Sequence, residues 1–158
     1  MPDDSPMFRM GPKAAWPTAE LGNRTDILMA DIPAGGKLSA RAVARMYAAL
    51  LGEVDGVRLV SPERLRQLSA VAFADVDQVM GFPTRWGLGF GIGLPGTQAD
   101  GPSTAFGVGG VGGSYAGADT ATGIAFALTK KLTKNRLTAD FGAAEQVAGI
   151  VTKAAAER

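Results

Sequence analysis

Apolar residues recur every three or four positions in two parts of the chain, and this spacing predicts amphipathic helices. The first helix is expected from an N-cap at Ser39 to Leu51, and a shorter one begins at Ser61-Pro62, where Ser caps and Pro opens the helix. A closing helix is expected over residues 140–156. In the first helix the inward positions are Val43, Met46, Tyr47, Leu50 and Leu51. In the closing helix they are Phe141, Ala144, Val147, Ile150, Val151 and Ala154.

The stretch from 81 to 128 has a different pattern, with only three charged side chains: Arg85, Asp100 and Asp119. Residues 87–117 also hold 12 of the 22 glycines. Short apolar runs of this kind predict strands, which we expect at 85–92, 104–108, 114–118 and 124–129. The last two are expected to form an antiparallel hairpin through the loop at Asp119.

Glycines at 87, 89, 91 and 93 alternate with bulky residues, which would place all four glycines on one face of a strand. Such a face either presses against a neighbouring segment or leaves space for a ligand. The alternation alone does not decide between the two.

The composition excludes several classes of function. The 158 residues suffice for one domain or part of one, and they contain no His and no Cys. A Ser-His-Asp triad, a thiol nucleophile, a disulfide and a cysteine or histidine metal site are therefore excluded, and we expect neither a metal nor a cofactor. With a net charge of +1 we expect no nucleic-acid partner. The acidic start and the short apolar runs predict neither a signal peptide nor a membrane span, which favours the cytoplasm.

Two motifs have a formal match to phosphate-binding sites. Gly107-x-Gly109-x-x-Gly112 fits a dinucleotide pattern, but a strand-like segment follows it instead of the required helix. The basic segment 130–136 is more typical of a solvated corner between a strand and a helix. Neither predicts a nucleotide site.

The same glycine-rich segment carries a resemblance to a known family. Phe106 to Ser114, followed by a strand, Asp119-x-x-Thr122-Gly123 and a second apolar strand, resembles the third conserved box of the serine β-lactamase-like hydrolases. This family includes class C β-lactamases, penicillin-binding D,D-peptidases and family VIII carboxylesterases. Segments 32–41, 52–63 and 86–90 resemble other family segments in the same order, so the similarity runs from about residue 20 to 130 and into the closing helix.

The resemblance implies an α/β (α+β) fold that is the C-terminal part of a β-lactamase/transpeptidase-like fold. Residues 1–19 would be an irregular lead-in, 20–80 a remnant of the helical lobe, and 81–158 an antiparallel sheet with the closing helix packed on it. A missing N-terminal half would supply a further helix and two strands. The open sheet edge left behind would favour self-association or pairing with that half.

The resemblance also implies a catalytic machinery that this chain lacks. The family uses the nucleophile and lysine of Ser-x-x-Lys and the tyrosine of Tyr-x-Asn or Tyr-x-Ser, and neither motif occurs here. Where the family has Lys-Thr-Gly, His-Thr-Gly or His-Gly-Gly, this chain has Val108, Gly109 and Gly110. A backbone N–H of Val111 or Gly112 would be an oxyanion donor. We therefore expect part of a groove for a small ester or amide, and no catalytic residue.

Three hypotheses about function follow from this comparison. The chain is the C-terminal portion of a serine ester or amide hydrolase and inactive alone, which we favour. It is one half of a split enzyme that a partner chain completes. Or it is a non-catalytic binding module that keeps the groove.

Overall fold

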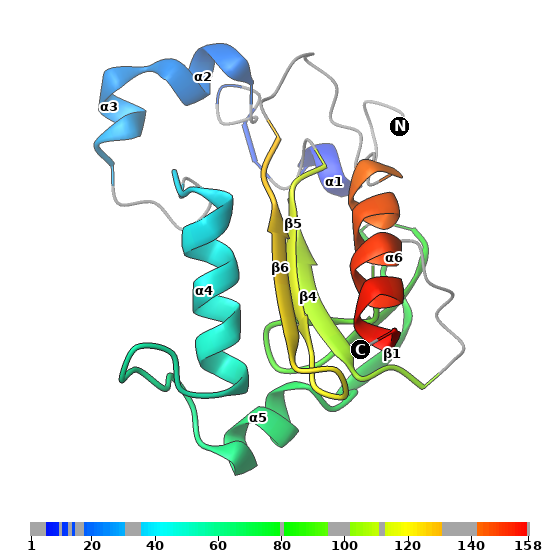
Figure 1. The fold of residues 1–158 in the computed structure, drawn as a ribbon. Coiled ribbons are helices and arrows are strands. Elements are labelled where there is room, and N and C mark those ends of the chain that lie inside the picture. Colours follow the sequence, from blue (N-terminus) through cyan, green and yellow to red (C-terminus); the bar gives the residue numbers. More distant parts are fainter. Residues whose placement is uncertain are drawn as a thin grey trace.

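One antiparallel sheet of six strands organises the molecule, with the strands in chain order from β1 to β6 (Figure 1). The computed structural model describes residues 6–9, 11–12, 14, 18–30, 36–79, 81–94, 102–110, 113–130 and 142–157. The strands are β1 (Phe73–Val76), β2 (Pro83–Trp86), β3 (Gly91–Ile92), β4 (Ala105–Gly109), β5 (Tyr115–Asp119) and β6 (Ile124–Leu128). The helices are α1 (Pro6–Arg9), α2 (Ala19–Asn23), α3 (Thr25–Leu28), α4 (Ala40–Leu51), α5 (Pro62–Leu68) and α6 (Gly142–Ala156).

Most of the predicted elements are confirmed, often to within one residue. The hydroxyl of Ser39 accepts the N–H of Ala42 at the start of α4, and Ser61 accepts the N–H of Arg64 at the start of α5. The predicted hairpin is the β5–β6 pair, with Asp119 opposite Ile124. An antiparallel sheet with helices on it is the predicted α+β class, which the structure confirms.

The single strand predicted over 85–92 is wrong, because the chain reverses within it. β2 ends at Trp86 and β3 begins at Gly91, its antiparallel partner. The N–H of Gly87 donates to the carbonyl of Phe90 at 2.7 Å, and Gly89 has a φ of 89°, which favours glycine. Gly87 and Gly89 therefore belong to a tight turn, and Gly87 also lies against a neighbouring segment, since a Cβ there would clash with the carbonyl oxygens of Leu68 and Ala70.

Four further elements, β1 and the short helices α1, α2 and α3, were not predicted. β1 pairs with β2 along its whole length, from Phe73 opposite Trp86 to Val76 opposite Pro83, so the sheet begins earlier in the chain than expected. About half of the expected irregular lead-in, residues 1–19, lies outside the described residues. Its described part includes the single turn of α1.

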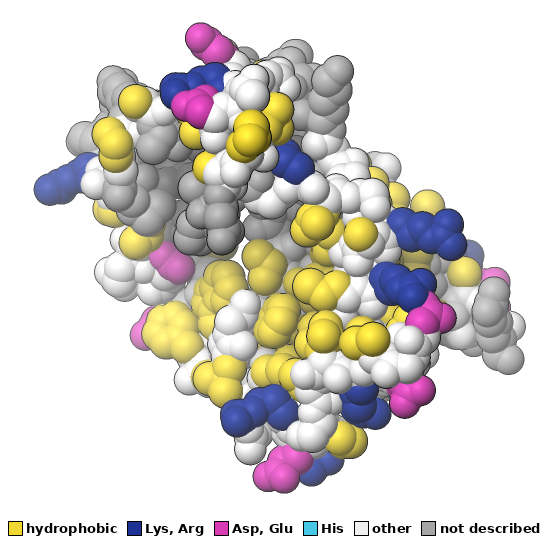
Figure 2. Space-filling view, turned by 90° about the vertical axis from the view of Figure 1, so that its left-hand side faces the viewer, with side chains coloured by type: hydrophobic (Ala, Val, Ile, Leu, Met, Phe, Trp, Pro, Cys, Tyr) yellow, Lys and Arg dark blue, Asp and Glu magenta, His cyan; other side chains and the backbone are white. Residues whose placement is uncertain are grey.

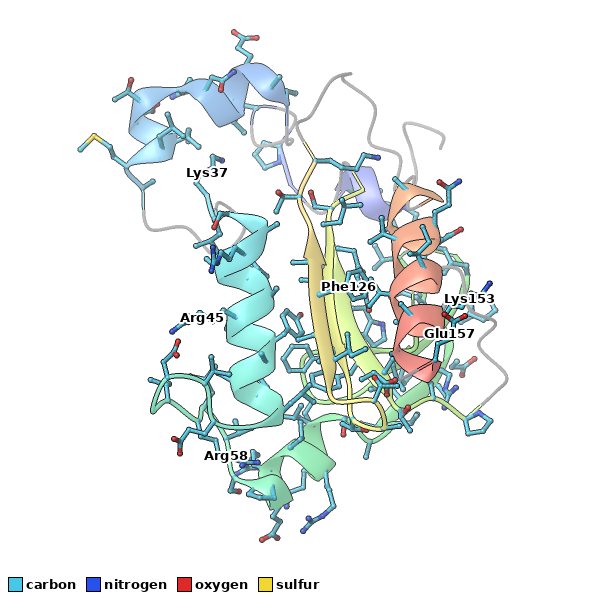
Figure 3. All side chains as sticks on the ribbon, viewed as in Figure 1. Lys37, Arg45, Arg58, Phe126, Lys153 and Glu157 are labelled. Carbon is cyan, nitrogen blue, oxygen red and sulfur yellow. The ribbon has the colours of Figure 1, made fainter. Side chains whose placement is uncertain are left out.

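The main core lies between the sheet and α4. Phe106 of β4 is fully buried and packs against the rings of Tyr47 and Phe90, with centroid distances of 6.2 and 5.2 Å. Leu50 of α4 and Leu68 of α5 complete the buried cluster together with small residues of the strands. Burying a side chain such as Phe106 stabilises the fold by about 1.5–3 kcal/mol. The cation Arg45 points away from the sheet on the outward side of α4 (Figure 3).

On its other face the sheet is covered by α6, which approaches through small residues (Figure 1). Ala144 and Ala148 are buried, whereas Ile150 is 69% exposed. The predicted inward stripe is therefore wrong at Ile150 and at Ala154, which is also exposed, because the helix presents Ala144, Ala148 and Val151 to the sheet. On α4, the predicted inward residue Met46 is likewise 42% exposed. Phe141 of that stripe lies outside the described residues.

The surface keeps many apolar side chains. Seen from the side of α4, hydrophobic side chains gather in the middle of the face, with Lys and Arg side chains at its borders (Figure 2). Within the described part of the chain, no helix has the length and apolar character that crossing a membrane requires.

Candidate functional site

The segment that resembles the third box lies at the end of β4 and in the turn after it. Val108 and Gly109 are the last residues of β4, and Gly110 follows. The N–H of Gly110 donates to the carbonyl of Ser114 at 2.8 Å, and the N–H of Gly113 donates to Gly110 at 3.1 Å. Val111 and Gly112, the predicted backbone donors, lie outside the described residues.

One backbone edge of β4 is open at Gly109. Because Gly110 bonds to Ser114 of the chain leading into β5, the alternation of an antiparallel ladder turns the backbone groups of Gly109 toward β3. β3, however, pairs with β4 only at Phe106 and Gly107, since the chain turns away before Gly91. The N–H and C=O of Gly109 therefore have no strand partner in the described part of the sheet.

By the resemblance to the third box, Val108 would occupy the position where the family carries a cation. Its side chain is 41% exposed and contributes no charge. The phenol of Tyr47 on α4 is buried, which raises its pKa, and the backbone N–H of Val108 partly opposes this effect. The phenol of Tyr47 is therefore neutral near pH 7.

A row of glycines crosses the centre of the sheet beside this edge. Gly91, Gly107 and Gly117 are consecutive cross-strand partners on β3, β4 and β5. The ring of Tyr115 lies over Gly117 and Gly107, and a Cβ at Gly117 would come within 2.7 Å of its hydroxyl. That hydroxyl donates to the carbonyl of Gly93 at 3.3 Å, and burial raises the pKa of Tyr115. The glycines leave room for an internal side chain, not for a ligand.

Every serine hydroxyl in the described part of the chain bonds to the backbone. Ser39 and Ser61 cap helices, and Ser69 donates to the carbonyl of Leu65 at 2.8 Å. Ser103 accepts the N–H of Ala105, and Ser114 accepts the N–H of Lys130 at 2.9 Å. Ser5 lies outside the described residues. A nucleophilic serine needs a neighbouring base to take its proton, and these hydroxyls have structural bonds instead.

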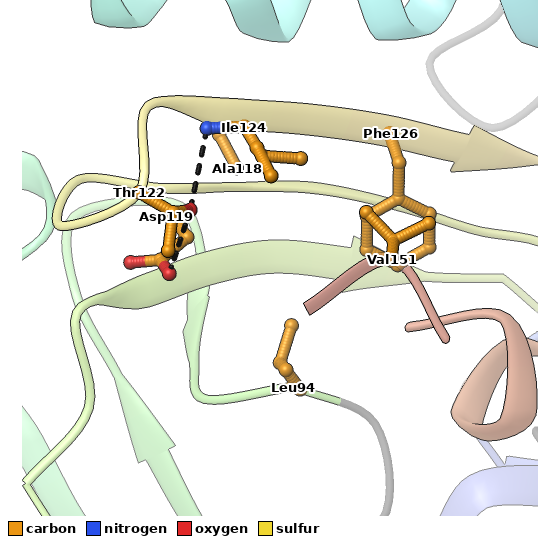
Figure 4. A pocket seen from close by; sticks show the side chains of 7 residues that line it. All are labelled: Leu94, Ala118, Asp119, Thr122, Ile124, Phe126 and Val151. Atoms are coloured by element: carbon orange, nitrogen blue, oxygen red, sulfur yellow. Dashed lines mark hydrogen bonds between the residues drawn. The ribbon is translucent and has the colours of Figure 1, made fainter. Parts of the chain in front are cut away.

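A small pocket opens at the other end of the β4–β5 pair, between the hairpin loop and α6 (Figure 4). It is lined by Leu94, Ala118, Asp119, Thr122, Ile124, Phe126 and Val151, and its volume is about 10 Å³. This volume corresponds to roughly one water molecule, so the pocket is far too small for an ester or a β-lactam. It also lies at the strand ends away from Val108 and Gly109.

Asp119, the acidic group at this pocket, is held by the loop. Burial opposes its ionisation, but the hydroxyls of Thr104 and Thr122 and the N–H of Ala121 donate to its carboxylate and together hold its pKa below the ordinary value. Among the described residues, no group of three acidic side chains gathers in a way that could hold a metal ion.

The structure therefore places Val108, Gly109 and Gly110 at an open backbone edge, and among the described residues no nucleophile or general base lies beside them. The sequence did not predict that the buried phenols of Tyr47 and Tyr115 lie near this edge. The signal for Tyr115 was present, since Tyr115 and Gly117 are two positions apart and must share one face of a strand.

Comparisons with known proteins identify relatives of the chain. Residues 3–148 match the family model described as Beta-lactamase. The chain is similar to the esterase/beta-lactamase LipL of Mycobacterium tuberculosis (strain ATCC 25618 / H37Rv), with 37% identity over 114 residues, which are 70% of this chain and 26% of that protein.

Solved structures of β-lactamase-like proteins also superpose on the chain. A family VIII carboxylesterase superposes with a TM-score of 0.64 and 28% identity, over 81% of this chain and 36% of the other. A penicillin-binding protein homologue from Caulobacter crescentus superposes with a TM-score of 0.57 and 31% identity, over 69% and 30%. The chain thus spans about a third or less of the length of these proteins.

Proposed function

The chain belongs to the β-lactamase family, as its resemblance predicted, and we propose that it is the C-terminal part of a serine hydrolase acting on a small ester or amide, inactive by itself. The related proteins are esterases, β-lactamases and penicillin-binding proteins by their names, which supports a hydrolase of this general type.

The observation that carries the proposal is that every described serine hydroxyl bonds to the backbone and that both phenols are buried. Five serines bond to backbone groups, and both tyrosines are buried with raised pKa values. The whole sequence contains neither Ser-x-x-Lys nor Tyr-x-Asn or Tyr-x-Ser. Acyl transfer to a serine needs a hydroxyl whose proton a base can remove, and the described part of the chain offers no serine with such a base beside it.

The open edge at Gly109 is the part of a substrate groove that this chain would contribute. Its unpaired N–H and C=O could pair with the carbonyl and amide groups of a substrate lying along β4. Val108 beside it adds apolar contact but no positive charge, so electrostatic stabilisation of an anionic substrate group would come from elsewhere.

Exposed aromatic residues on β1 and β2 support the proposal that a further part of the protein covers this end of the sheet. Phe73 and Trp86 are opposite one another and are 48% and 37% exposed, and Phe82 before β2 is 49% exposed. Apolar side chains gathered in this way are typical of a contact surface. The remaining N-terminal half, either in the same polypeptide or as the partner in a split enzyme, would pack there. A non-catalytic binding module is the alternative.

Hydrolysis assays test the proposal directly. We expect the purified chain to release no product above background from short nitrophenyl esters or from nitrocefin, with an intact family VIII carboxylesterase as the positive control. A fluorescent alkyl phosphonate, which labels activated serines covalently, should leave the chain unlabelled.

Saturable turnover would contradict the proposal if it were abolished by replacing one serine, and Ser114→Ala is the first variant to examine. Ser114 is the last residue of the segment that resembles the third box. Ser39→Ala, at the N-cap of α4, is the matched control.

A further inference from the structure

The connection between α4 and α5 carries the dipeptide Asp55-Gly56 at the tip of a tight hairpin. Val54 and Val57 form an antiparallel bridge, in which the N–H of each donates to the carbonyl of the other at 2.9 and 3.0 Å. Asp55 and Gly56 have φ angles of 48° and 77°, the two positive values of a type I′ turn. Among the described residues, Asp55 is the only one other than glycine with a positive φ.

The backbone nitrogen of Gly56 is accessible to the side chain that precedes it. In a two-residue hairpin the flanking residues make the bonds across the turn, and no hydrogen bond of the Gly56 N–H is found among the described residues. Both tip residues are exposed, and a Cβ built on Gly56 would meet no atom within 4 Å beyond its chain neighbours. Because glycine has no side chain, nothing screens its nitrogen from the carboxyl group of Asp55. The tip therefore has the space that ring closure between two neighbouring residues requires.

The carboxylate of Asp55 is paired with Arg45 of α4. The two side chains form an exposed ion pair, and Arg45 extends from the outward side of the helix (Figure 3). A positive neighbour favours the ionised form of a carboxyl group. That form is a poor electrophile, because a nitrogen that attacks it has no neutral leaving group to displace. The ion pair thus holds the carboxyl group in its less reactive state.

We propose that Asp55-Gly56 is a site of spontaneous isoaspartate formation and that its ion pair with Arg45 restrains the reaction. The nitrogen of Gly56 attacks Cγ of the protonated Asp55 carboxyl group and forms a C–N bond. The N–H proton and the carboxyl hydroxyl leave together as water, and a five-membered imide remains. Water then opens the ring at either carbonyl: cleavage at Cγ restores Asp, and cleavage at the main-chain carbonyl leaves isoaspartate, in which the chain runs through Cγ.

Nothing outside the turn and the solvent takes part in this reaction. No atom is oxidised or reduced, and the water released in the first step is replaced in the second. The reacting atoms belong to two neighbouring residues, so the site does not depend on what packs elsewhere on the protein. The inference is also independent of the proposed hydrolase function.

Isoaspartate would loosen the connection between α4 and α5. It adds a methylene group to the main chain, so the two-residue turn no longer closes with the same bonds. Beside the turn, Arg58 donates to the carbonyl of Leu51 at 3.3 Å, and the N–H of Leu59 donates to the carbonyl of Ala49 at 2.9 Å. These bonds attach the hairpin to the last turn of α4, and we expect them to weaken first.

Peptide mapping after ageing tests the proposal, because trypsin isolates this dipeptide. Cleavage after Arg45 and Arg58 releases peptide 46–58, in which Asp55 is the only Asp. The folded chain is incubated at neutral pH in water enriched in heavy oxygen and then digested in ordinary water. Each passage through the imide leaves a heavy oxygen atom in the peptide, whether Asp or isoaspartate is formed. A methyltransferase specific for isoaspartate measures the second product separately.

Two other peptides of the same digest provide comparisons. Peptide 67–85 contains Asp75 and Asp77, which are followed by Val and Gln, and should stay unlabelled because a side chain screens the next nitrogen. The second Asp-Gly pair of the chain, at 100–101, lies outside the described residues and is released in a different peptide, 86–130. Its label therefore cannot be confused with that of peptide 46–58.

Two matched arginine variants test the restraint. Arg45→Gln removes the ion pair, whereas Arg41→Gln removes the same charge from an exposed position one turn earlier on α4. Exposed ion pairs are weak, so we expect Arg45→Gln to label peptide 42–58, its equivalent of 46–58, about 2–5-fold faster and Arg41→Gln to match the unmodified chain. Circular dichroism checks that both variants keep the fold.

Each result decides one part of the proposal. Labelling of peptide 46–58 that does not exceed that of peptide 67–85 overturns the site itself. Equal rates in Arg45→Gln and Arg41→Gln overturn the restraint by the ion pair. Since no hydrolase substrate is used, either result leaves the proposed function to its own assay.

Discussion

A single methyl group added at Gly107 should destabilise the protein strongly, because the space beside this glycine is filled by backbone and by Tyr115. A Cβ there would clash with the carbonyl oxygen of Ala116 and the hydroxyl of Tyr115, and would lie 2.8 Å from the Cα of Gly117. Gly110 offers a matched control three residues later. Its added Cβ would have Ser114 O as nearest neighbour, at an ordinary 3.9 Å.

The difference between the two variants isolates the cost of the clash. Replacing glycine by alanine removes about 0.4–1 kcal/mol of unfolded-state entropy at either position, and this gain cancels in the comparison. Overpacking costs about 1–3 kcal/mol. Two of the three close atoms belong to the backbone of β5 and cannot rotate away, so we expect Gly107→Ala to be less stable than Gly110→Ala by about 3 kcal/mol.

Urea unfolding followed by circular dichroism, at a protein concentration low enough to keep the chain monomeric, measures both free energies of unfolding. Repeating Gly107→Ala in a Tyr115→Leu background removes the hydroxyl but leaves the carbonyl of Ala116, so most of the cost should persist. Equal stability of Gly107→Ala and Gly110→Ala would refute the view that the glycine row is closed by backbone and Tyr115.

Two further variants probe the hairpin loop and the third-box segment. The lowered pKa of Asp119 contributes stability at neutral pH that is lost as the pH falls below about 4, so the deficit of Asp119→Asn, measured by urea unfolding at several pH values, should shrink toward acid; a deficit independent of pH would contradict this role. Val108→His restores a basic residue to the box but should leave ester hydrolysis at background, since there is no nucleophile to deprotonate; turnover by this variant would mean that our alignment of Val108 is wrong.

The helices and the hairpin could be predicted because their signals are local. Ser39 and Ser61 cap helices through bonds to residues three positions away, and the Asp119 loop closes through its own side chains. Such features depend on neighbours in the sequence and survive whatever the rest of the fold does.

The errors concern features that depend on distant partners. Alternating glycines at 87–93 fit both a strand and a turn, and only the pairing of Trp86 with Gly91 decides for the turn. Ile150 was expected inside because it is apolar, yet α6 packs through alanines, since small residues let a helix approach the sheet closely. The sequence also did not predict the open edge at Gly109. This edge arises because β3 is shorter than β4 and has no residue paired with Gly109.

The coding sequence immediately upstream of this chain tests the central claim most directly. If the chain is the C-terminal part of a β-lactamase-related serine hydrolase, reading the genomic DNA should reveal a segment that encodes Ser-x-x-Lys followed by Tyr-x-Asn or Tyr-x-Ser, in frame, frame-shifted or as a separate gene. Upstream DNA without these motifs would contradict the account and favour a binding module that uses the open edge at Gly109 without chemistry.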